Sequence, residues 1–270
     1  MAQILLATDF SPVAQNAASY AAHLARYLQM DLVLFHAYII PFAYADSAVP
    51  LLNTEEVRAI SEASMDAENI RLKALEPSLS IISRIVPGDL IDCIHEEIQE
   101  NSPVLIVLGT SGDKEDSVLW GSMAVKALRA FTVPVLTVPS KAAWEPLSKM
   151  CFAADYHTIT ENTPFHEISK WVKLMNAGFS VVHIDTPPAQ TTEPPALLRS
   201  SLANLDPTYH SVSTDRIEEG VQAFINHHQI DWLILIPRKY GFWKSLFHKS
   251  RTKMLAQVSH IPILSLHQKG

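Results

Sequence analysis

Residues 105–139, LIVLGTSGDKEDSVLWGSMAVKALRAFTVPVLTVP, contain the pattern that decides the fold. The apolar run at 104–108 is short and rich in β-branched side chains, which predicts a buried parallel strand rather than a helix. A glycine-containing loop, a helical pattern and a second strand at 133–138 follow. A strand, a crossover helix and another strand make up the repeating unit of an α/β protein.

Three glycines and a serine in this stretch, Gly109, Gly112, Gly121 and Ser122, have the spacing G-x2-G-x8-G-S. Glycines at the carboxyl end of a strand, followed by Gly-Ser at the start of a helix, allow backbone N–H groups to approach a phosphate. The spacing is neither the dinucleotide fingerprint G-x-G-x-x-G nor a P-loop, because no lysine follows the glycines. The loop is a candidate phosphate cradle; the alternative is that its glycines only permit a tight turn.

The rest of the first half alternates strands with helices. Strands are predicted at 4–7, 32–36 and 79–86, and helices at 13–28, 54–75 and 90–99. Alternation on this scale predicts a doubly wound parallel sheet.

The pattern restarts near residue 149, so the chain is a tandem repeat. Asp155 recurs about 146 residues after Asp9, and His183 about 147 residues after His36. The last strand, expected at 261–266, recurs only about 128 residues after its counterpart, so the second copy is shorter between its second and fourth strands. The predicted domains are residues 1–140 and 149–270, joined by a linker at 139–149.

The second copy has lost the glycines of the loop. Pro237, Tyr240 and Lys249 stand where the first copy has its three glycines. The close backbone approach that glycine permits is absent there, so we expect no phosphate cradle in the second domain. The aromatic stretch at 240–248 indicates packing or a protein contact instead.

These residues resemble the universal stress protein family, whose nucleotide-binding members carry G-x2-G-x9-G-[S/T]. The resemblance also covers ILLATDFS at 4–11, the strand ending in His36 and Ala37, and VPG at 86–88; the loop here is one residue shorter. It implies two doubly wound parallel-sheet domains of the adenine nucleotide alpha hydrolase-like, universal stress protein type. The last strands of the two copies are expected to pair, forming an internal pseudo-dimer.

The resemblance also implies a nucleotide site, with ATP or AMP as the ligand and Mg²⁺ as a further candidate. Adenine is expected between the ends of the first two strands, and the phosphates along the glycine loop. Carried over position by position, the implied residues are Ala7, Thr8, Asp9, Ala37, Leu108, Gly109, Gly112, Gly121, Ser122 and Met123. An anion at a helix N-terminus gains about 1 kcal/mol or more from the dipole and the unpaired donors.

The chemistry of the loop leaves alternatives open. Residues 113–120 carry three carboxylates and one lysine, which repel a triphosphate unless Mg²⁺ intervenes or the side chains point outward. Asp9 is expected to cap the first helix and orient the adenine turn, rather than act as a base or metal ligand. No nucleophile with a positioned base is identifiable, so no catalytic residue is predicted. A nucleotide-free scaffold and a slow ATP hydrolase remain the alternatives.

Composition limits the partners. With 28 acidic against 21 basic residues, a net charge of −7 argues against nucleic acid. No apolar run approaches the ~20 residues that span a bilayer, no signal peptide is recognisable, and the two cysteines lack C-x-x-C spacing. A cytoplasmic protein, with a homodimer and an unknown protein partner left open, is expected. Nine of the twelve histidines lie in the second copy; zinc binding there is weighed against scattered polar histidines.

Overall fold

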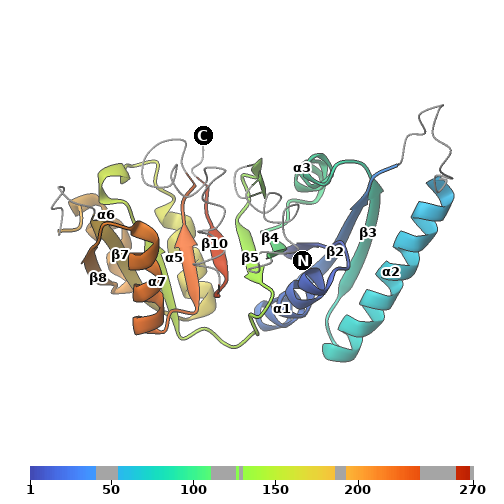
Figure 1. Ribbon diagram of the computed structural model, residues 1–270, viewed down its shortest axis with the longest axis horizontal. Coiled ribbons are helices and arrows are strands. Elements are labelled where there is room, and N and C mark those ends of the chain that lie inside the picture. The colour runs from blue at the N-terminus through green and yellow to red at the C-terminus, as the bar shows by residue number, and fades with distance from the viewer. Residues whose placement is uncertain (41–53, 111–125, 128–129, 186–192, 238–259, 268–270) are drawn as a thin grey trace. The chain divides into compact units, whose positions relative to one another are not determined.

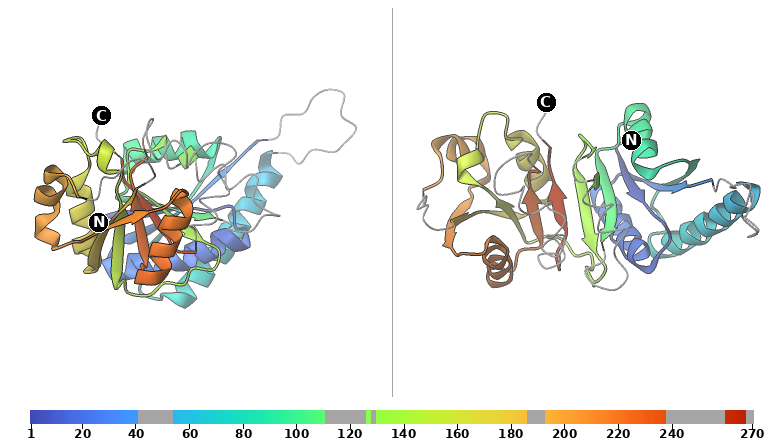
Figure 2. Two further views of the ribbon diagram at one scale, coloured as in Figure 1. Left: turned by 60° about the vertical axis from the view of Figure 1, so that its left-hand side comes forward. Right: turned by 45° about the horizontal axis from the view of Figure 1, so that its top comes forward.

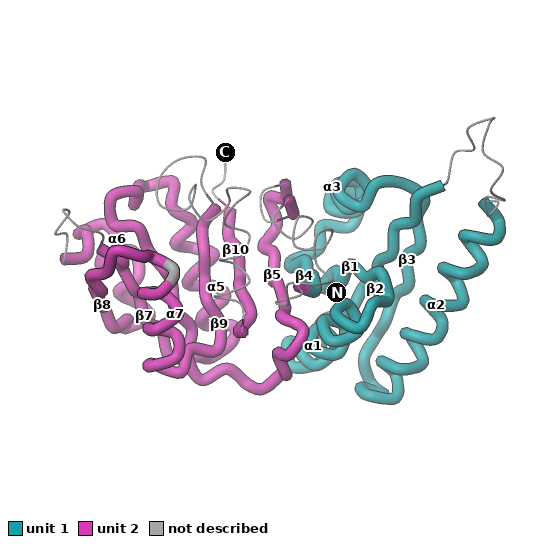
Figure 3. The backbone as a smooth tube through the Cα atoms, in the orientation of Figure 1, with its two compact units in different colours: residues 1–109 teal, residues 110–270 magenta. Residues whose placement is uncertain are grey.

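The computed structural model describes residues 1–40, 54–110, 126–127, 130–185, 193–237 and 260–267. Its internal contacts divide the chain into two compact units, Met1–Gly109 and Thr110–Gly270 (Figure 3). The predicted glycine loop therefore lies mostly outside the described residues, whereas the strands and turns that precede it are described.

Unit 1 is a parallel sheet with helices on both faces (Figure 1). Its strands stand in the order β3-β2-β1-β4. The elements are β1 (Gln3–Ala7), α1 (Pro12–Leu28), β2 (Asp31–Tyr38), α2 (Thr54–Leu75), β3 (Ile81–Pro87), α3 (Leu90–Asn101) and β4 (Leu105–Thr110). Helices α1 and α2 contact one another on one face, and α3 lies on the other, as right-handed crossovers require (Figure 2).

Local sequence explains how α1 begins and ends. The Ser11 hydroxyl accepts the N–H of Ala14 at the N-cap, and Pro12 occupies the first turn, where its missing N–H costs nothing. Gln29 ends the helix in a left-handed conformation, with its N–H on the carbonyl groups of the last turn. The face that packs on the sheet is mostly alanine, which brings α1 close to the strands.

Unit 2 contains the second copy of the same pattern, in the strand order β5-β10-β9-β6-β7-β8. Its elements are β5 (Val135–Pro139), β6 (Lys149–Ala153), α5 (Phe165–Met175), β7 (Gly178–Asp185), α6 (Ala196–Leu202), β8 (Thr208–Ser213), α7 (Ile217–His228), β9 (Trp232–Leu235) and β10 (Ile263–Ser265), with short 3-10 turns at Tyr156–Thr158 and Ala203–Leu205. Its second helix, α6, has 7 residues where α2 has 22, which explains why the second copy is shorter.

The last strands of the two copies pair with each other, as predicted. β5 and β10 run antiparallel, with Leu136 opposite Leu264, whereas β10 with β9, β9 with β6, β6 with β7 and β7 with β8 are parallel pairs. Both strands begin two residues later than the sequence indicated, after Pro134 and Pro262, because proline cannot donate a ladder hydrogen bond. Since β5 pairs with β10, it groups with unit 2, so contacts divide the chain at Gly109. The sequence-based domain limits of 1–140 and 149–270 stay a prediction.

Both cysteines are buried and unpaired. Burial raises the pKa of the Cys151 thiol, which keeps it protonated and unreactive. Within the described residues, no helix is long and apolar enough to cross a membrane.

Candidate functional site

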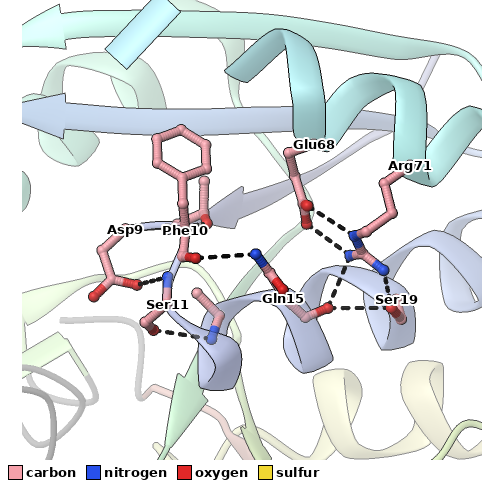
Figure 4. Close-up of polar contacts among 9 residues, drawn as sticks. Asp9, Phe10, Ser11, Gln15, Ser19, Glu68 and Arg71 are labelled. Atoms are coloured by element: carbon pink, nitrogen blue, oxygen red, sulfur yellow. Dashed lines mark hydrogen bonds and ion pairs between the residues drawn. The ribbon is translucent and has the colours of Figure 1, made fainter. Parts of the chain in front are cut away.

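The turn that follows β1 is the best-defined part of the candidate site (Figure 4). The chain leaves the strand through Thr8, Asp9 and Phe10, and Phe10 has a φ of 63°, in the left-handed region that a bulky side chain seldom occupies. The Phe10 N–H donates to the Thr8 hydroxyl over 3.0 Å. This tight turn connects β1 to α1, and the Asp9 side chain lies next to the N-terminus of the helix.

Asp9 does not cap α1, which corrects the expectation from the sequence. Its carboxylate accepts the N–H of Ser11 over 3.0 Å, and Ser11 itself is the N-cap. Asp9 lies two residues before the cap, and its hydrogen bond across the left-handed Phe10 holds the capping residue in place. Asp9 is only partly buried, so its other oxygen lone pairs remain available to a ligand donor.

Two side chains from other positions support this turn. The His36 Nδ1–H, at the end of β2, donates to the Thr8 carbonyl over 2.8 Å, and the His36 and Phe10 rings lie 4.6 Å apart. The Gln15 amide donates to the Phe10 carbonyl over 3.2 Å. Thr8 is 2% exposed, and its backbone N–H donates to Phe35. Its backbone is therefore used to build the turn rather than to contact a ligand.

Gly109 is a strand residue that allows α1 to pack closely against β4, not a residue of the glycine loop. The sequence indicated that strand four ends before Gly109, but β4 continues through Thr110. A Cβ on Gly109 would lie 2.9 Å from the carbonyl oxygen of Val13, closer than side-chain Cβ atoms approach other atoms. The absent side chain lets the first turn of α1 lie against β4, which fixes the position of the Asp9 turn.

A network behind the turn ties α1 to α2 (Figure 4). The Arg71 guanidinium donates to both carboxylate oxygens of Glu68 over 2.8 and 2.7 Å, and also to the Ser19 hydroxyl and the Gln15 carbonyl. Glu68 is 4% exposed, so its charge is balanced by this bidentate ion pair. Because Gln15 also bonds to Phe10, the network connects α2 to the turn.

The second copy repeats the aspartate and histidine hydrogen bonds after its own first strand, but with a different backbone. Asp155 is the N-cap of the 3-10 helix Tyr156–Thr158, and Tyr156 does not have the positive φ of Phe10. Asp155 accepts the N–H of His157 over 3.1 Å, as Asp9 accepts that of Ser11. The His183 Nδ1–H donates to the Ala154 carbonyl over 3.0 Å, and the ring of Tyr156 stacks on it at 4.2 Å. Because this nitrogen donates its proton, the 3.4 Å approach of the Tyr156 N–H to it is not a hydrogen bond.

The two turns differ in exposure. In the first copy, Asp9, Phe10, His36 and Ala37 are all partly exposed. Their counterparts in the second copy are all buried: Asp155 is 9% exposed, Tyr156 4%, His183 2% and Ile184 4%. Burial lowers the pKa of His183, which keeps its imidazole neutral, and raises the pKa of Tyr156 to about 12. The first turn is therefore partly exposed, whereas the second is buried.

Comparison with known proteins identifies the family. The Universal stress protein family matches residues 1–139. The chain belongs to this family. A comparison with curated protein sequences finds no match.

Solved structures show the universal stress protein fold over the whole chain. The universal stress protein of Archaeoglobus fulgidus DSM 4304 matches with a TM-score of 0.71 at 13% identity, covering 98% of this chain and 96% of that one. A functionally unknown protein of Pseudomonas aeruginosa PAO1 matches with a TM-score of 0.58 at 15% identity, covering 98% and 92%. A universal stress protein family protein of Arabidopsis thaliana with AMP bound matches 53% of this chain and 94% of that one at 16% identity, with a TM-score of 0.36.

The structure brings together part of the site predicted from the universal stress protein pattern. Ala7 lies opposite Phe35 on one side and Leu108 on the other, so the ends of β1, β2 and β4 are adjacent. Thr8, Asp9, Ala37 and Gly109 belong to the same edge of the sheet. Gly112, Gly121, Ser122 and Met123, expected at the phosphates, lie outside the described residues.

Sequence reasoning missed the residues that shape the turn. Phe10 and Gln15 belong to no motif of the predicted site, and His36 enters the prediction only as the end of a strand. The signal was present in the repeat, because Asp-Phe at 9–10 and Asp-Tyr at 155–156 both place an aromatic ring after the carboxylate. The histidine recurs with it in each copy.

The histidines of the second copy do not gather as metal ligands in the part of the chain that the structure describes. His210 and His228 instead pack around Phe224, with the His228 ring stacked on Phe224 at 4.1 Å and the two imidazoles 4.7 Å apart. Burial, and then the neighbouring His228, lower the pKa of His210. This is an aromatic cluster on α7 and β8.

Proposed function

We propose that this universal stress protein binds one adenine nucleotide, ATP or AMP, in its first copy and acts through the bound state in stress response or signalling. Adenine would lie at the adjacent ends of β1, β2 and β4, beside Asp9. The phosphates would extend along the glycine loop of Gly112, Gly121, Ser122 and Met123. The second copy would serve as the pairing partner of the first.

The contrast between the two turns carries this proposal. The same pair of hydrogen bonds, one accepted by an aspartate and one donated by a histidine, follows the first strand of each copy. Only the first is partly exposed, and only the first copy has glycines at all three positions of the loop motif, where the second has Pro237, Tyr240 and Lys249. Ligands of open α/β sheets bind at the carboxyl ends of the strands where the strand order reverses, here between β1 and β4.

Different residues would contact the base, the ribose and the phosphates of the nucleotide. The Asp9 carboxylate, held by Ser11, accepts hydrogen bonds and therefore suits the exocyclic amine of adenine or a ribose hydroxyl. Ala7 and Leu108 are buried apolar residues on neighbouring strands and would form the floor beneath the base. Backbone N–H groups of the glycine loop and the Ser122 hydroxyl suit the phosphates. Mg²⁺ would offset the carboxylates of residues 113–120.

Calorimetric titration of ATP and AMP, each with and without Mg²⁺, tests the proposal. The intact protein is expected to bind about one nucleotide per chain, because only one of the two turns is partly exposed. Gly121→Val is expected to abolish binding by placing a side chain where the phosphate approaches. No binding of either nucleotide, and none released on denaturation, would refute the proposal and favour a scaffold that uses the same fold without a ligand.

Hydrolysis is tested on the same samples. A slow ATP hydrolase would form ADP above the background rate, and the product would disappear in Asp9→Ala. Binding without formation of ADP supports a protein that responds to bound nucleotide rather than one that hydrolyses it.

A further inference from the structure

Helix α2 lies at the edge of unit 1 (Figure 1), and one of its faces carries exposed apolar side chains. The helix buries Ser61, Met65, Glu68 and Leu72. Another set of apolar side chains is exposed; we call these the α2 seam: Ile60, Ala63, Ala67, Ile70 and Ala74. Ile60 is 57% exposed and Ile70 is 73% exposed. Among the described residues, seven large apolar side chains are exposed, and Ile60 and Ile70 are two of them that share one face of a helix.

The spacing of the α2 seam is that of a helix pair. Its members follow one another at intervals of three, four, three and four residues, as the a and d positions of a heptad do. At about 100° per residue, the seam covers an arc of about 80°, nearly opposite the buried stripe. A partner helix can therefore lie along the seam without meeting the sheet beneath α2.

The charges beside the seam select the partner. Asp66 and Lys73 lie on the same flank, one heptad apart, at g positions. In an antiparallel pair of two α2 helices, with Ala67 of one beside Ile70 of the other, the g flanks face each other. Asp66 of each copy then faces Lys73 of the other, and the twofold symmetry makes this ion pair twice. We propose that the α2 seam binds the α2 seam of a second copy of this chain, antiparallel.

A parallel pair fits less well. It would place Asp66 opposite Arg71, whose Nε, Nη1 and Nη2 already donate to Glu68, Ser19 and Gln15. Lys73 is exposed, and its ammonium donates one bond, to the Leu79 carbonyl, so two of its three donors remain. The antiparallel arrangement therefore uses the lysine whose donors are available.

The strand pairing within the chain points to a helix interface. β5 and β10 pair with each other inside one chain, so these last strands are already satisfied. A second copy must associate through another surface. The α2 seam is narrow, so the dimer is expected to be reversible, with a Kd on the order of micromolar or weaker.

Sedimentation equilibrium of the full chain over a wide range of concentration tests the dimer. The intact protein is expected to show monomers and dimers in exchange, and Ile70→Lys to weaken the dimer at least about tenfold. Ile39→Lys is the matched control, because Ile39 is also 73% exposed but lies just after β2, away from the seam. A chain that stays monomeric at every concentration, or a dimer that both variants weaken equally, would overturn the proposal.

Charge exchange tests the antiparallel register. Asp66→Lys alone and Lys73→Asp alone each place like charges opposite each other and should weaken the dimer, whereas the double variant should restore it. A loss with Asp66→Lys but not with Lys73→Asp would indicate parallel helices and overturn the antiparallel pairing. Both side chains are exposed, so circular dichroism should show an unchanged fold in all three variants. Nucleotide plays no part in this test, so its outcome is independent of the proposed nucleotide site.

Discussion

Gly109→Ala should disturb the candidate site without touching a ligand. The new Cβ would lie 2.9 Å from the carbonyl oxygen of Val13, and 3.1 Å from both its carbonyl carbon and its Cγ1. Two of these three atoms are backbone, so a change of rotamer cannot relieve the contact and the first turn of α1 must shift. Overpacking of this kind costs about 1–3 kcal/mol in free energy of unfolding.

Thermal unfolding measures this cost, because each kcal/mol lowers the Tm of a domain of this size by about 2–4 °C or somewhat more. Gly178→Ala is the matched control: its Cβ would come no closer than 3.3 Å to the Ser148 carbonyl oxygen, so we expect a small change. Nucleotide affinity should also fall in Gly109→Ala, because the shifted turn carries Asp9. If the two variants have the same stability and bind nucleotide equally, the role assigned to Gly109 is wrong.

Three further predictions concern stability. Arg71→Ala leaves the buried Glu68 carboxylate without its ion pair. Because the Arg71 side chain is 38% exposed, we expect urea unfolding to show a loss of about 2–3 kcal/mol in free energy of unfolding, below the about 3–5 kcal/mol of fully buried pairs. If Glu68→Gln in the same chain restores stability, the unpaired carboxylate is the cause; no restoration contradicts this explanation. The pKa of His183 is lower in the folded protein than its ordinary value of 6.5, so its contribution to stability is complete above pH 6.5 and is lost as pH falls through the folded pKa. Urea unfolding at pH 8 and pH 5 should show this loss, smaller in His183→Gln; an equal loss in both would assign it to other groups. Gly88→Ala should destabilise unit 1, because Gly88 has a φ of 141° and its Cβ would lie 2.8 Å from the Cys93 sulfur. If Cys93→Ser in the same chain restores full stability, the contact rather than the backbone conformation is the cause.

The strand order and the duplication could be predicted from the sequence because both follow from local sequence patterns. Apolar runs separated by helical periods identify the strands, and the recurrence of Asp9 and His36 as Asp155 and His183 marks the second copy. The pairing of β5 with β10 followed from the family resemblance. The ends of the strands could be predicted less accurately, because a glycine such as Gly109 indicates a loop, whereas β4 continues through Thr110.

The details of the turn depend on tertiary structure. The sequence identified Asp9 as a site residue but gave it the role of Ser11, because the assignment depends on the left-handed φ of Phe10, which a phenylalanine does not signal. The difference in exposure between the two turns depends on how Tyr156 and His183 stack, which no local pattern reveals. The Arg71 network joins residues far apart in the chain and could not be read from spacing.

The most direct test of the central claim compares Asp9→Ala with Asp155→Ala in a calorimetric titration with ATP and AMP. Each substitution removes a hydrogen bond from the aspartate to the N–H two residues later, over 3.0 Å in the first copy and 3.1 Å in the second. A hydrogen bond to a charged group contributes about 1.5–3 kcal/mol, so losing Asp9 should weaken nucleotide binding about tenfold or more. The account predicts this loss for Asp9→Ala and an unchanged affinity for Asp155→Ala, at about one nucleotide per chain. Binding that survives in Asp9→Ala but is lost in Asp155→Ala would place the site in the second copy and contradict the account.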